Sequence, residues 1–177
     1  MTKVNTKQLT GVALDWAVAM CEGYTLTTDG ISPLVEKEGK LSILGPATSG
    51  GKPCGYSPSS YWAQGGLIID REGIDIHQVK KHPFHTYAYS EKTKARYPEG
   101  VVSATPNGTR FIKVPRAPGP NDGKWTARMS IDHHPFGWKK EDFMSDTALI
   151  AAMRCYVASK LGGYVDVPAE LVRDAVE

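Results

Sequence analysis

The sequence predicts an α+β fold in which two helices pack on a small, largely antiparallel sheet, with a basic β-hairpin as an extension. Three observations support it: two segments with apolar residues at helical spacing, a strictly alternating strand segment, and an Asn-Gly turn between β-rich runs. The chain has 177 residues, enough for one sizeable core. We therefore expect a single α+β domain over residues 1–177, with residues 77–121 as a basic, Pro-rich insertion that contains the hairpin.

The first predicted helix runs from Thr6 to Cys21, with Thr6 as a candidate N-cap and Gly23 as the stop. Its apolar residues recur at steps of three and four and form one core-facing stripe, made of Leu9, Val12, Ala13, Trp16, Ala17 and Met20.

The second predicted helix runs from about Asp146 to Leu161, with Ser145 or Asp146 as its cap and Gly162 as its stop. Its shared apolar face is made of Leu149, Ala152, Met153, Tyr156, Val157 and Leu161. Small alanines beside this face favour close packing against a sheet or against the first helix.

Strand signals lie between the two helices. The segment Lys124–Ile131 alternates, with Trp125, Ala127, Met129 and Ile131 on one face. Residues 101–105 and 109–114 flank Pro106-Asn107-Gly108, where Asn-Gly favours a tight hairpin turn because both residues tolerate positive φ. The run Leu67–Ile69 predicts a short buried strand.

The segment 56–66 is the main candidate for a site, because it combines turn formers, hydroxyls, an indole and an amide. Ser57 is a candidate helix cap, and Gly65 or Gly66 would supply a left-handed exit. Two interpretations stay open: Trp62 fills the core and its neighbours form a turn, or the segment recognises a ligand. The proposed ligand-binding residues are Tyr56, Ser57, Ser59, Trp62, Gln64, Gly65, Gly66 and Arg154.

Standard catalytic and metal motifs are missing from the sequence. The Gly-rich segment 45–53 is no Walker A loop, because Pro53 follows Lys52 where a Ser or Thr is needed. The pairs His82/His85 and His133/His134 lack the spacing of a zinc site, and no Gly-x-Ser-x-Gly occurs. We therefore name no catalytic residue, no metal ligand and no cofactor, and leave an enzyme without a motif as the third hypothesis.

Positive charge gathers in one part of the chain. Between His77 and Lys140 there are 12 Lys and Arg residues and four acidic residues, a net charge of +8 where the whole chain carries +2. Aromatic residues interleave with these charges at Phe84, Tyr87, Tyr89, Tyr97 and Phe111. The pattern is compatible with a nucleic-acid or other phosphate-bearing partner, or with a solvated basic face and ordinary packing.

Three motifs together carry a family resemblance: Leu14-Asp15-Trp16-Ala17-Val18-Ala19, Tyr56–Ser59 with Trp62–Gly66, and Leu149–Gly162. With the Trp125-Thr126-Ala127 strand, they resemble the phage nin-region protein X family, small proteins of tailed phages and prophages of enteric bacteria. Two departures are the segment 77–121, which looks like an insertion relative to shorter members, and an altered entry to the last helix at Ser145–Ala148. The resemblance implies a phage accessory protein and assigns no role to any residue.

Two main hypotheses for function follow. The first is a phage protein that binds a small polar, nucleotide-like ligand, a candidate for counter-defence by sequestering a host signal. The alternative is an interaction protein that contacts a host protein or nucleic acid through the basic region 77–140. No apolar run approaches the ~20 residues of a membrane span, so we expect the host cytoplasm and no membrane partner. An exposed helix face would support a homo-oligomer.

Overall fold

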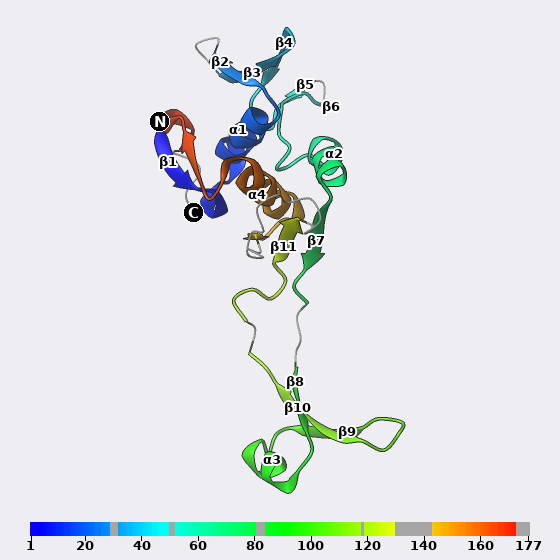
Figure 1. Cartoon of the computed structure of the whole chain (residues 1–177). Helices are drawn as coiled ribbons and strands as arrows, with labels where there is room; N and C mark the ends of the chain where they lie inside the picture. The colour runs from blue at the N-terminus through cyan, green and yellow to red at the C-terminus, as the bar shows by residue number, and fades with distance from the viewer. Residues whose placement is uncertain (29–31, 50–51, 81–83, 118, 130–142, 173–177) are drawn as a thin grey trace. The chain divides into compact units, whose positions relative to one another are not determined.

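The computed structural model describes residues 1–28, 32–49, 52–80, 84–117, 119–129 and 143–172 (Figure 1). The chain divides into two compact units: a main unit of residues 1–78 and 124–177, and a basic unit of residues 79–123. In sequence, the basic unit contains eight Lys and Arg residues against three acidic residues. This unit overlaps residues 77–121, and the interpretation of that segment as an insertion stays a prediction.

The described residues contain five α-helices and one 3-10 helix. They are η1 (Thr6–Gln8), α1 (Gly11–Cys21), α2 (Trp62–Glu72), α3 (Glu91–Arg96), α4 (Ala148–Leu161) and α5 (Ala169–Val172). The strands are β1 (Thr2–Asn5), β2 (Thr25–Thr28), β3 (Pro33–Lys37), β4 (Lys40–Ile43), β5 (Thr48–Ser49), β6 (Lys52–Pro53), β7 (Ile74–Gln78), β8 (Phe84–Ala88), β9 (Val101–Ala104), β10 (Arg110–Pro115), β11 (Trp125–Met129), β12 (Phe143–Ser145) and β13 (Tyr164–Val167). The longest described helix, α4, has 14 residues, and no described helix has the length and apolarity to span a membrane.

The strands form several small antiparallel sheets. The main unit holds the sheets β12-β11-β7, β2-β3-β4, β1-β13 and β5-β6, and the basic unit holds β8-β10-β9. All pairings between these strands are antiparallel. The predicted α+β class is therefore confirmed, whereas the simpler picture of two helices on one sheet is replaced by five small sheets. The reason is that the strands are short: among the described residues none is longer than six, and turns separate them.

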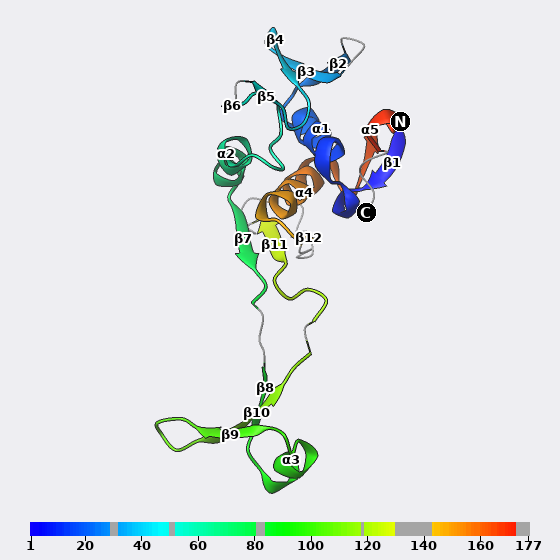
Figure 2. The same cartoon turned by 180° about the vertical axis from the view of Figure 1, so that it is seen from behind.

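The helices α1 and α4 form the centre of the main unit. They lie against each other, and α4 also packs on the sheet β12-β11-β7 (Figures 1 and 2). Every residue of α1 from Ala13 to Ala19 is buried, and so is most of α4. A helix that is apolar on nearly all sides is stable only inside a protein. The buried surface of α1 is therefore wider than the one-sided stripe that the sequence predicts.

The first helix begins later than the sequence predicted. Thr6 does not cap an α-helix: its side chain donates to the Gly162 carbonyl at 2.8 Å, and its backbone N–H donates to the Gly163 carbonyl at 3.0 Å. The hydroxyl thus joins the segment after β1 to the loop between α4 and β13, next to the pair β1-β13. The α-helix starts at Gly11, after a separate 3-10 turn.

The predicted strand Leu67–Ile69 is wrong, because these residues lie inside α2. A three-residue apolar run has too few positions to separate a period of 2 from a period of 3.6. The helical spacing is visible only with Gly65 and Ile68, which are the buried residues of α2. The predicted left-handed exit at Gly65 or Gly66 is also wrong, since α2 ends at Gly73, which has φ +60°.

Other predicted elements are confirmed with small shifts. The hairpin pairs Arg110 with Ala104 and Lys113 with Val101, as the Asn-Gly turn indicated. The alternating strand forms β11, in the centre of its sheet. The last helix begins at Ala148 with Thr147 as its N-cap, in place of Ser145 or Asp146, because the Thr147 hydroxyl accepts the Ile150 N–H at 3.2 Å.

Candidate nucleic-acid interface

The basic unit is a three-stranded sheet with a short helix. β10 lies between β8 and β9, and α3 connects β8 to β9 in the sequence. The buried face includes Ile112, which is fully buried. A Cβ atom at Gly100 would lie 3.0 Å from Ile112 Cγ1 and 3.1 Å from the Tyr97 carbonyl oxygen. A glycine at position 100 therefore lets the segment after α3 approach the sheet closely.

Hydrogen bonds fix α3 at both ends. The Ser90 side chain caps the helix by accepting the Thr93 N–H at 3.0 Å. The Lys94 ammonium donates to the Pro98 carbonyl at 2.6 Å and to the Gly100 carbonyl at 2.9 Å. Lys94 is therefore used within the fold. Lys92 and Arg96 are exposed instead and make no hydrogen bond or ion pair with another described residue.

Lys92 and Arg96 border an aromatic pair. Tyr87 on β8 and Tyr97 after α3 stack with ring centroids 4.9 Å apart and an angle of 12° between the rings. Together with Thr93, these four residues line a hollow of about 290 Å³. Lys92 and Arg96 are four residues apart on α3, so their side chains lie on the same face of the helix. The hollow thus combines two stacked rings with two unpaired cations.

The phenol of Tyr87 is uncharged near neutral pH. The hydrogen bond with Tyr97 raises the pKa of Tyr87 above its ordinary value, and desolvation adds to this rise. Tyr87 therefore stays protonated at neutral pH and adds no negative charge beside Lys92 and Arg96. An anion meets a cationic and aromatic surface at this point.

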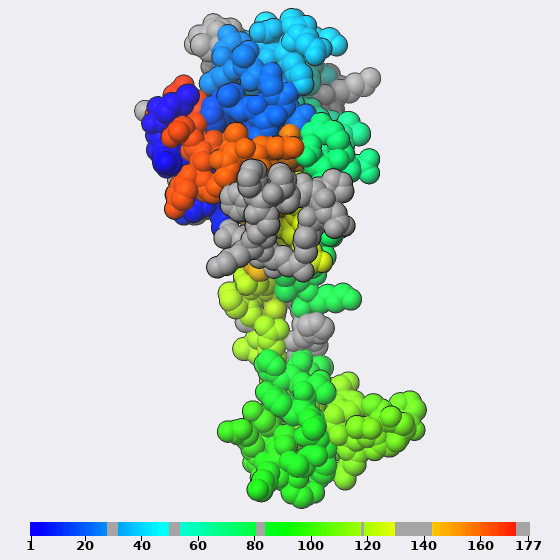
Figure 3. Space-filling model, in the orientation of Figure 1, coloured from blue at the N-terminus to red at the C-terminus, as the bar shows by residue number. Residues whose placement is uncertain are grey.

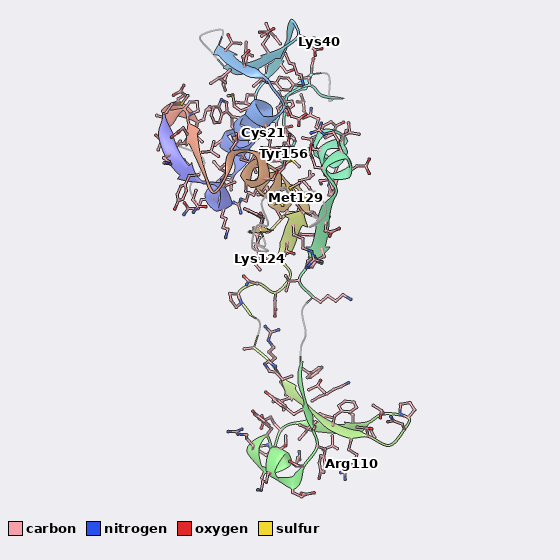
Figure 4. All side chains as sticks on the ribbon, in the orientation of Figure 1. Cys21, Lys40, Arg110, Lys124, Met129 and Tyr156 are labelled. Carbon is pink, nitrogen blue, oxygen red and sulfur yellow. The ribbon has the colours of Figure 1, made fainter. Side chains whose placement is uncertain are left out.

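A contact between a cation and a ring joins β10 to the residue that follows β8. The Arg110 guanidinium, labelled in Figure 4, sits 3.9 Å from the centroid of the Tyr89 ring. Tyr89 donates its hydroxyl to the Glu91 carboxylate at 2.7 Å. The ring of Tyr89 is thereby held in place, with the planar guanidinium stacked on it. This pair gives a second planar group suitable for stacking, although Glu91 reduces the local positive charge.

This arrangement has the chemistry of nucleic-acid recognition. Flat side chains stack on bases without regard to sequence, and exposed Lys and Arg neutralise phosphates. Within the described residues of the basic unit, no group of three or more His, Cys, Asp or Glu residues is placed to hold a metal ion. The geometry therefore favours binding of an anionic, aromatic ligand.

The predicted site at residues 56–66 lies in the main unit, where much of its polar chemistry serves the fold. Gln64 accepts the Ser57 N–H at 2.7 Å through its amide oxygen, and its amide nitrogen donates to the Gly55 carbonyl at 2.8 Å. Both ends of the Gln64 amide are thus occupied by the turn that precedes α2. The stretch is held by these bonds as a rigid turn.

The hydroxyl-bearing residues proposed as ligand contacts in this stretch are buried or half-buried. Ser57 and Ser59 are buried, and the Ser59 N–H donates to the Asp15 carboxylate at 2.8 Å. The Tyr56 ring packs on Tyr24 with centroids 4.7 Å apart. The Tyr56 hydroxyl is buried and has no hydrogen-bond partner among the described residues.

Trp62 neither fills the core nor faces a described cavity. It is 55% exposed at the first turn of α2. Gly65 faces inward, where an added Cβ would lie 2.2 Å from the Pro58 carbonyl oxygen and 2.7 Å from Leu149 Cδ2. Gly66 has ordinary space, with Trp62 Cε3 as the nearest atom at 3.5 Å. Trp62 therefore lies at the surface, whereas the amide of Gln64 is bonded within the turn before α2.

Arg154 is separated from this stretch by its role in α4. Its Nε donates to the Leu9 carbonyl at 2.7 Å, and its Nη1 donates to the Met144 carbonyl at 2.8 Å. Burial lowers the pKa of Arg154. The guanidinium joins α4 to the segment before α1 and to β12, and no contact brings it to Trp62 or Gln64. Arg154 as a ligand contact stays a prediction without support from this geometry.

The sequence indicated part of the new site. The interleaving of aromatic and basic residues included Tyr87, Tyr89 and Tyr97. It did not select Lys92 and Arg96, although their spacing of four residues is a usable signal once α3 is known. No group of three or more His, Cys, Asp or Glu among the described residues is placed to hold a metal, and His82, His133 and His134 lie outside those residues.

A comparison with protein families identifies a relationship of this chain. A family model described as "Bacteriophage P22, NinX" matches residues 5–104. This span contains α1, α2, α3 and the strands from β2 to β9, and so includes the tyrosine pair with Lys92 and Arg96. A search of curated proteins found no match.

Proposed function

Because the chain belongs to the bacteriophage P22 NinX family, we propose that it is a phage accessory protein that binds single-stranded nucleic acid through its basic unit. The observation that carries this proposal is the hollow in which Tyr87 and Tyr97 stack beside Lys92 and Arg96. Stacking on tyrosine is tolerant of base identity, and cations beside the rings bind the phosphates between bases.

Charge supports the same function. The basic unit has a net sequence charge of +5, from eight basic and three acidic residues. Lys94 is used by the fold, whereas Lys92 and Arg96 have no described partner. A cation that the protein leaves unpaired beside an aromatic surface is available to an incoming phosphate.

A single strand fits better than a duplex. In a duplex the bases are stacked on each other, and their faces are not accessible to tyrosine. A helix that reads the major groove must reach into it, and α3 has only six residues, about 9 Å of helix. The basic unit offers rings and cations in a shallow hollow, which suits bases that are already unstacked.

A free nucleotide shares this chemistry, since it also presents a base and a phosphate. The hypothesis of a small nucleotide-like ligand therefore has more support at Tyr87 and Tyr97 than at residues 56–66, where the amide of Gln64 is already bonded. Sequestering a host signal would then use the same hollow. A host protein as partner stays a prediction with no specific observation in its favour.

The test is binding of the full chain to a fluorescent oligothymidylate of about 20 nucleotides, measured by anisotropy over a range of salt concentrations. The variant carries Lys92→Gln and Arg96→Gln, and the matched control carries Lys3→Gln and Lys40→Gln, both exposed residues of the main unit. We expect the first variant to bind more weakly and to lower the slope of log K against log salt by about 1.4. The control should leave both quantities close to wild type.

Two results would overturn the proposal: no binding to the oligonucleotide at low salt, or equal weakening by the two double variants. A duplex of the same length and a mononucleotide are added as competitors. Preferential competition by the mononucleotide would assign the hollow to a free nucleotide, and preferential competition by the duplex would contradict the single-strand assignment.

A further inference from the structure

Three flat side chains lie in a row along one face of the strand β8. They are His85, Tyr87 and Tyr89, each two residues from the next, and alternate residues of a strand point to the same side. The ring centroids of His85 and Tyr87 are 6.1 Å apart. Tyr89 follows the last residue of β8, but its N–H donates to the Arg110 carbonyl at 3.2 Å, so the pairing with β10 continues through it. The row is therefore part of the sheet of the basic unit, which is drawn from green to yellow-green in Figure 3.

The row extends the hollow in both directions along β8. Its middle ring, Tyr87, lines the hollow with Tyr97. On one side His85 is exposed. On the other side Tyr89 is half-buried, and the exposed Arg110 places its guanidinium 3.9 Å from the centroid of the ring. A planar group thus lies on either side of the one that nucleic-acid binding by the hollow would use.

The other face of β8 carries different side chains. Phe84 and Thr86 alternate with the row and are exposed. On the neighbouring strand β10, Arg110 lies opposite Tyr89 and shares the face of the row. Lys113 is paired with Thr86 and belongs to the other face. Each face therefore has an aromatic residue and a cation that can be changed separately.

The spacing of the row matches an extended nucleic-acid strand. An antiparallel β-strand rises about 3.4 Å per residue, so neighbours in the row repeat every ~6.8 Å. Bases that stack on one another in a duplex repeat every ~3.4 Å along each strand. A row with twice that repeat matches a strand whose bases are pulled apart, so that each base contacts a group of the protein.

We propose that this row binds three consecutive nucleotides of a single strand, one base at His85, one at the tyrosine pair of the hollow, and one at Arg110. The guanidinium has one side toward Tyr89, and its other side stacks on a base, as arginine planes do with unstacked bases. His85 is then a base contact outside the hollow. The inference rests on the proposed function and extends it from a single base to a footprint of three.

The test compares His85→Ala with Phe84→Ala, which removes the adjacent ring from the opposite face of the same strand. The full chain is titrated with thymidine monophosphate and with thymidine di-, tetra- and octanucleotides, in competition with the labelled oligothymidylate. We expect His85→Ala to weaken binding of the tetranucleotide about fivefold or more, because it removes one stacked base. It should leave the monophosphate unchanged, since one nucleotide occupies only the hollow. Phe84→Ala should bind every ligand within about twofold of wild type.

Arg110→Gln and Lys113→Gln form a second matched pair, because each removes one positive charge from β10, on opposite faces. Their effects on long-range attraction of phosphates are therefore similar. Arg110→Gln should weaken the tetranucleotide about fivefold more than Lys113→Gln does, because it also removes a stacking plane. Circular dichroism confirms that all four variants are folded.

The outcomes separate this inference from the proposed function. Equal effects within either pair overturn the row, and so does a loss with His85→Ala that is as large for the monophosphate as for the tetranucleotide. The proposed function survives those results if the double variant of Lys92 and Arg96 still weakens oligonucleotide binding. No binding of any length at low salt overturns both.

Discussion

Tyr156 on α4 donates its hydroxyl to the Glu22 carboxylate, just after the end of α1, at 2.5 Å. Figure 4 labels Tyr156 and Cys21, the last residue of α1, close together. Arg71 of α2 binds the same carboxylate with two nitrogens, at 2.5 and 3.0 Å. One acidic side chain therefore links three helices. Burial alone would raise the pKa of Glu22, but the hydrogen bonds from Arg71 and Tyr156 hold it below its ordinary value.

Tyr156→Phe should destabilise the main unit by about 1–2 kcal/mol at pH 7, because it removes a hydrogen bond to a charged group while leaving the buried ring. The measurement is urea unfolding followed by circular dichroism. Tyr164→Phe is the control, since Tyr164 is exposed on β13 and should change the free energy of unfolding by less than about 0.5 kcal/mol. Equal effects of the two variants would show that the Glu22 contact contributes nothing.

The buried Asp15 predicts that the stability of the main unit falls as pH rises. Its pKa is raised, whereas that of Glu22 is lowered. The Asp15 carboxyl is fully buried, with Oδ1 bonded to the Ser59 N–H and Oδ2 without a described partner. Burial raises the pKa of Asp15 from 3.8 to about 6, against the lowering effect of the Ser59 hydrogen bonds. The native state therefore binds this proton more tightly than the unfolded chain does. It loses up to about 3 kcal/mol of stability from Asp15 as pH rises from about 4 to above 6.

Asp15→Asn removes this titration. We expect the stability of the variant relative to wild type to increase as pH rises from 4 to 7, by up to about 3 kcal/mol, in urea unfolding at several pH values. Asp166→Asn, an exposed change on β13, should follow the wild-type profile. Parallel profiles for Asp15→Asn and wild type would mean that the buried carboxyl does not titrate in this range.

The elements that could be predicted are those whose signal is local. The periodicity of residues 149–161 is enough to place α4, and Asn107-Gly108 is enough to place the hairpin between β9 and β10. The short apolar run Leu67–Ile69 predicts a strand, whereas these residues belong to α2, in which Gly65 packs closely against Pro58 and Leu149. That contact is tertiary and cannot be found from the run itself.

The candidate site was predicted less well for the same reason. Gln64 was proposed as a ligand contact from its chemistry, but the fold closes its amide onto Gly55 and Ser57. Tyr87 and Tyr97 are ten residues apart, and their stacking depends on the turn after α3, which brings Tyr97 back to β8. Residue types indicate what a side chain can bind, whereas the partners already present decide whether it is available.

If the hollow of the basic unit binds bases, Tyr97→Leu should weaken oligonucleotide binding by about 1–3 kcal/mol, because leucine cannot stack on a base. The salt dependence should stay unchanged, since no phosphate contact is lost. Tyr97→Phe retains the ring and should bind within a few fold of wild type. Equal affinity of Tyr97→Leu and Tyr97→Phe, with both variants folded by circular dichroism, would contradict stacking at this residue.

Gly65 and Gly66 are neighbours on α2 for which the structure predicts opposite effects of the same substitution. A Cβ at Gly65 would lie 2.2 Å from the Pro58 carbonyl oxygen, a backbone atom that cannot move without displacing the turn. A Cβ at Gly66 would meet nothing closer than 3.5 Å. Gly65→Ala should therefore cost about 2 kcal/mol or more. Gly66→Ala should gain up to about 1 kcal/mol from helix propensity, measured by urea unfolding. A loss at Gly66 equal to that at Gly65 would contradict the room found for a Cβ beside Trp62.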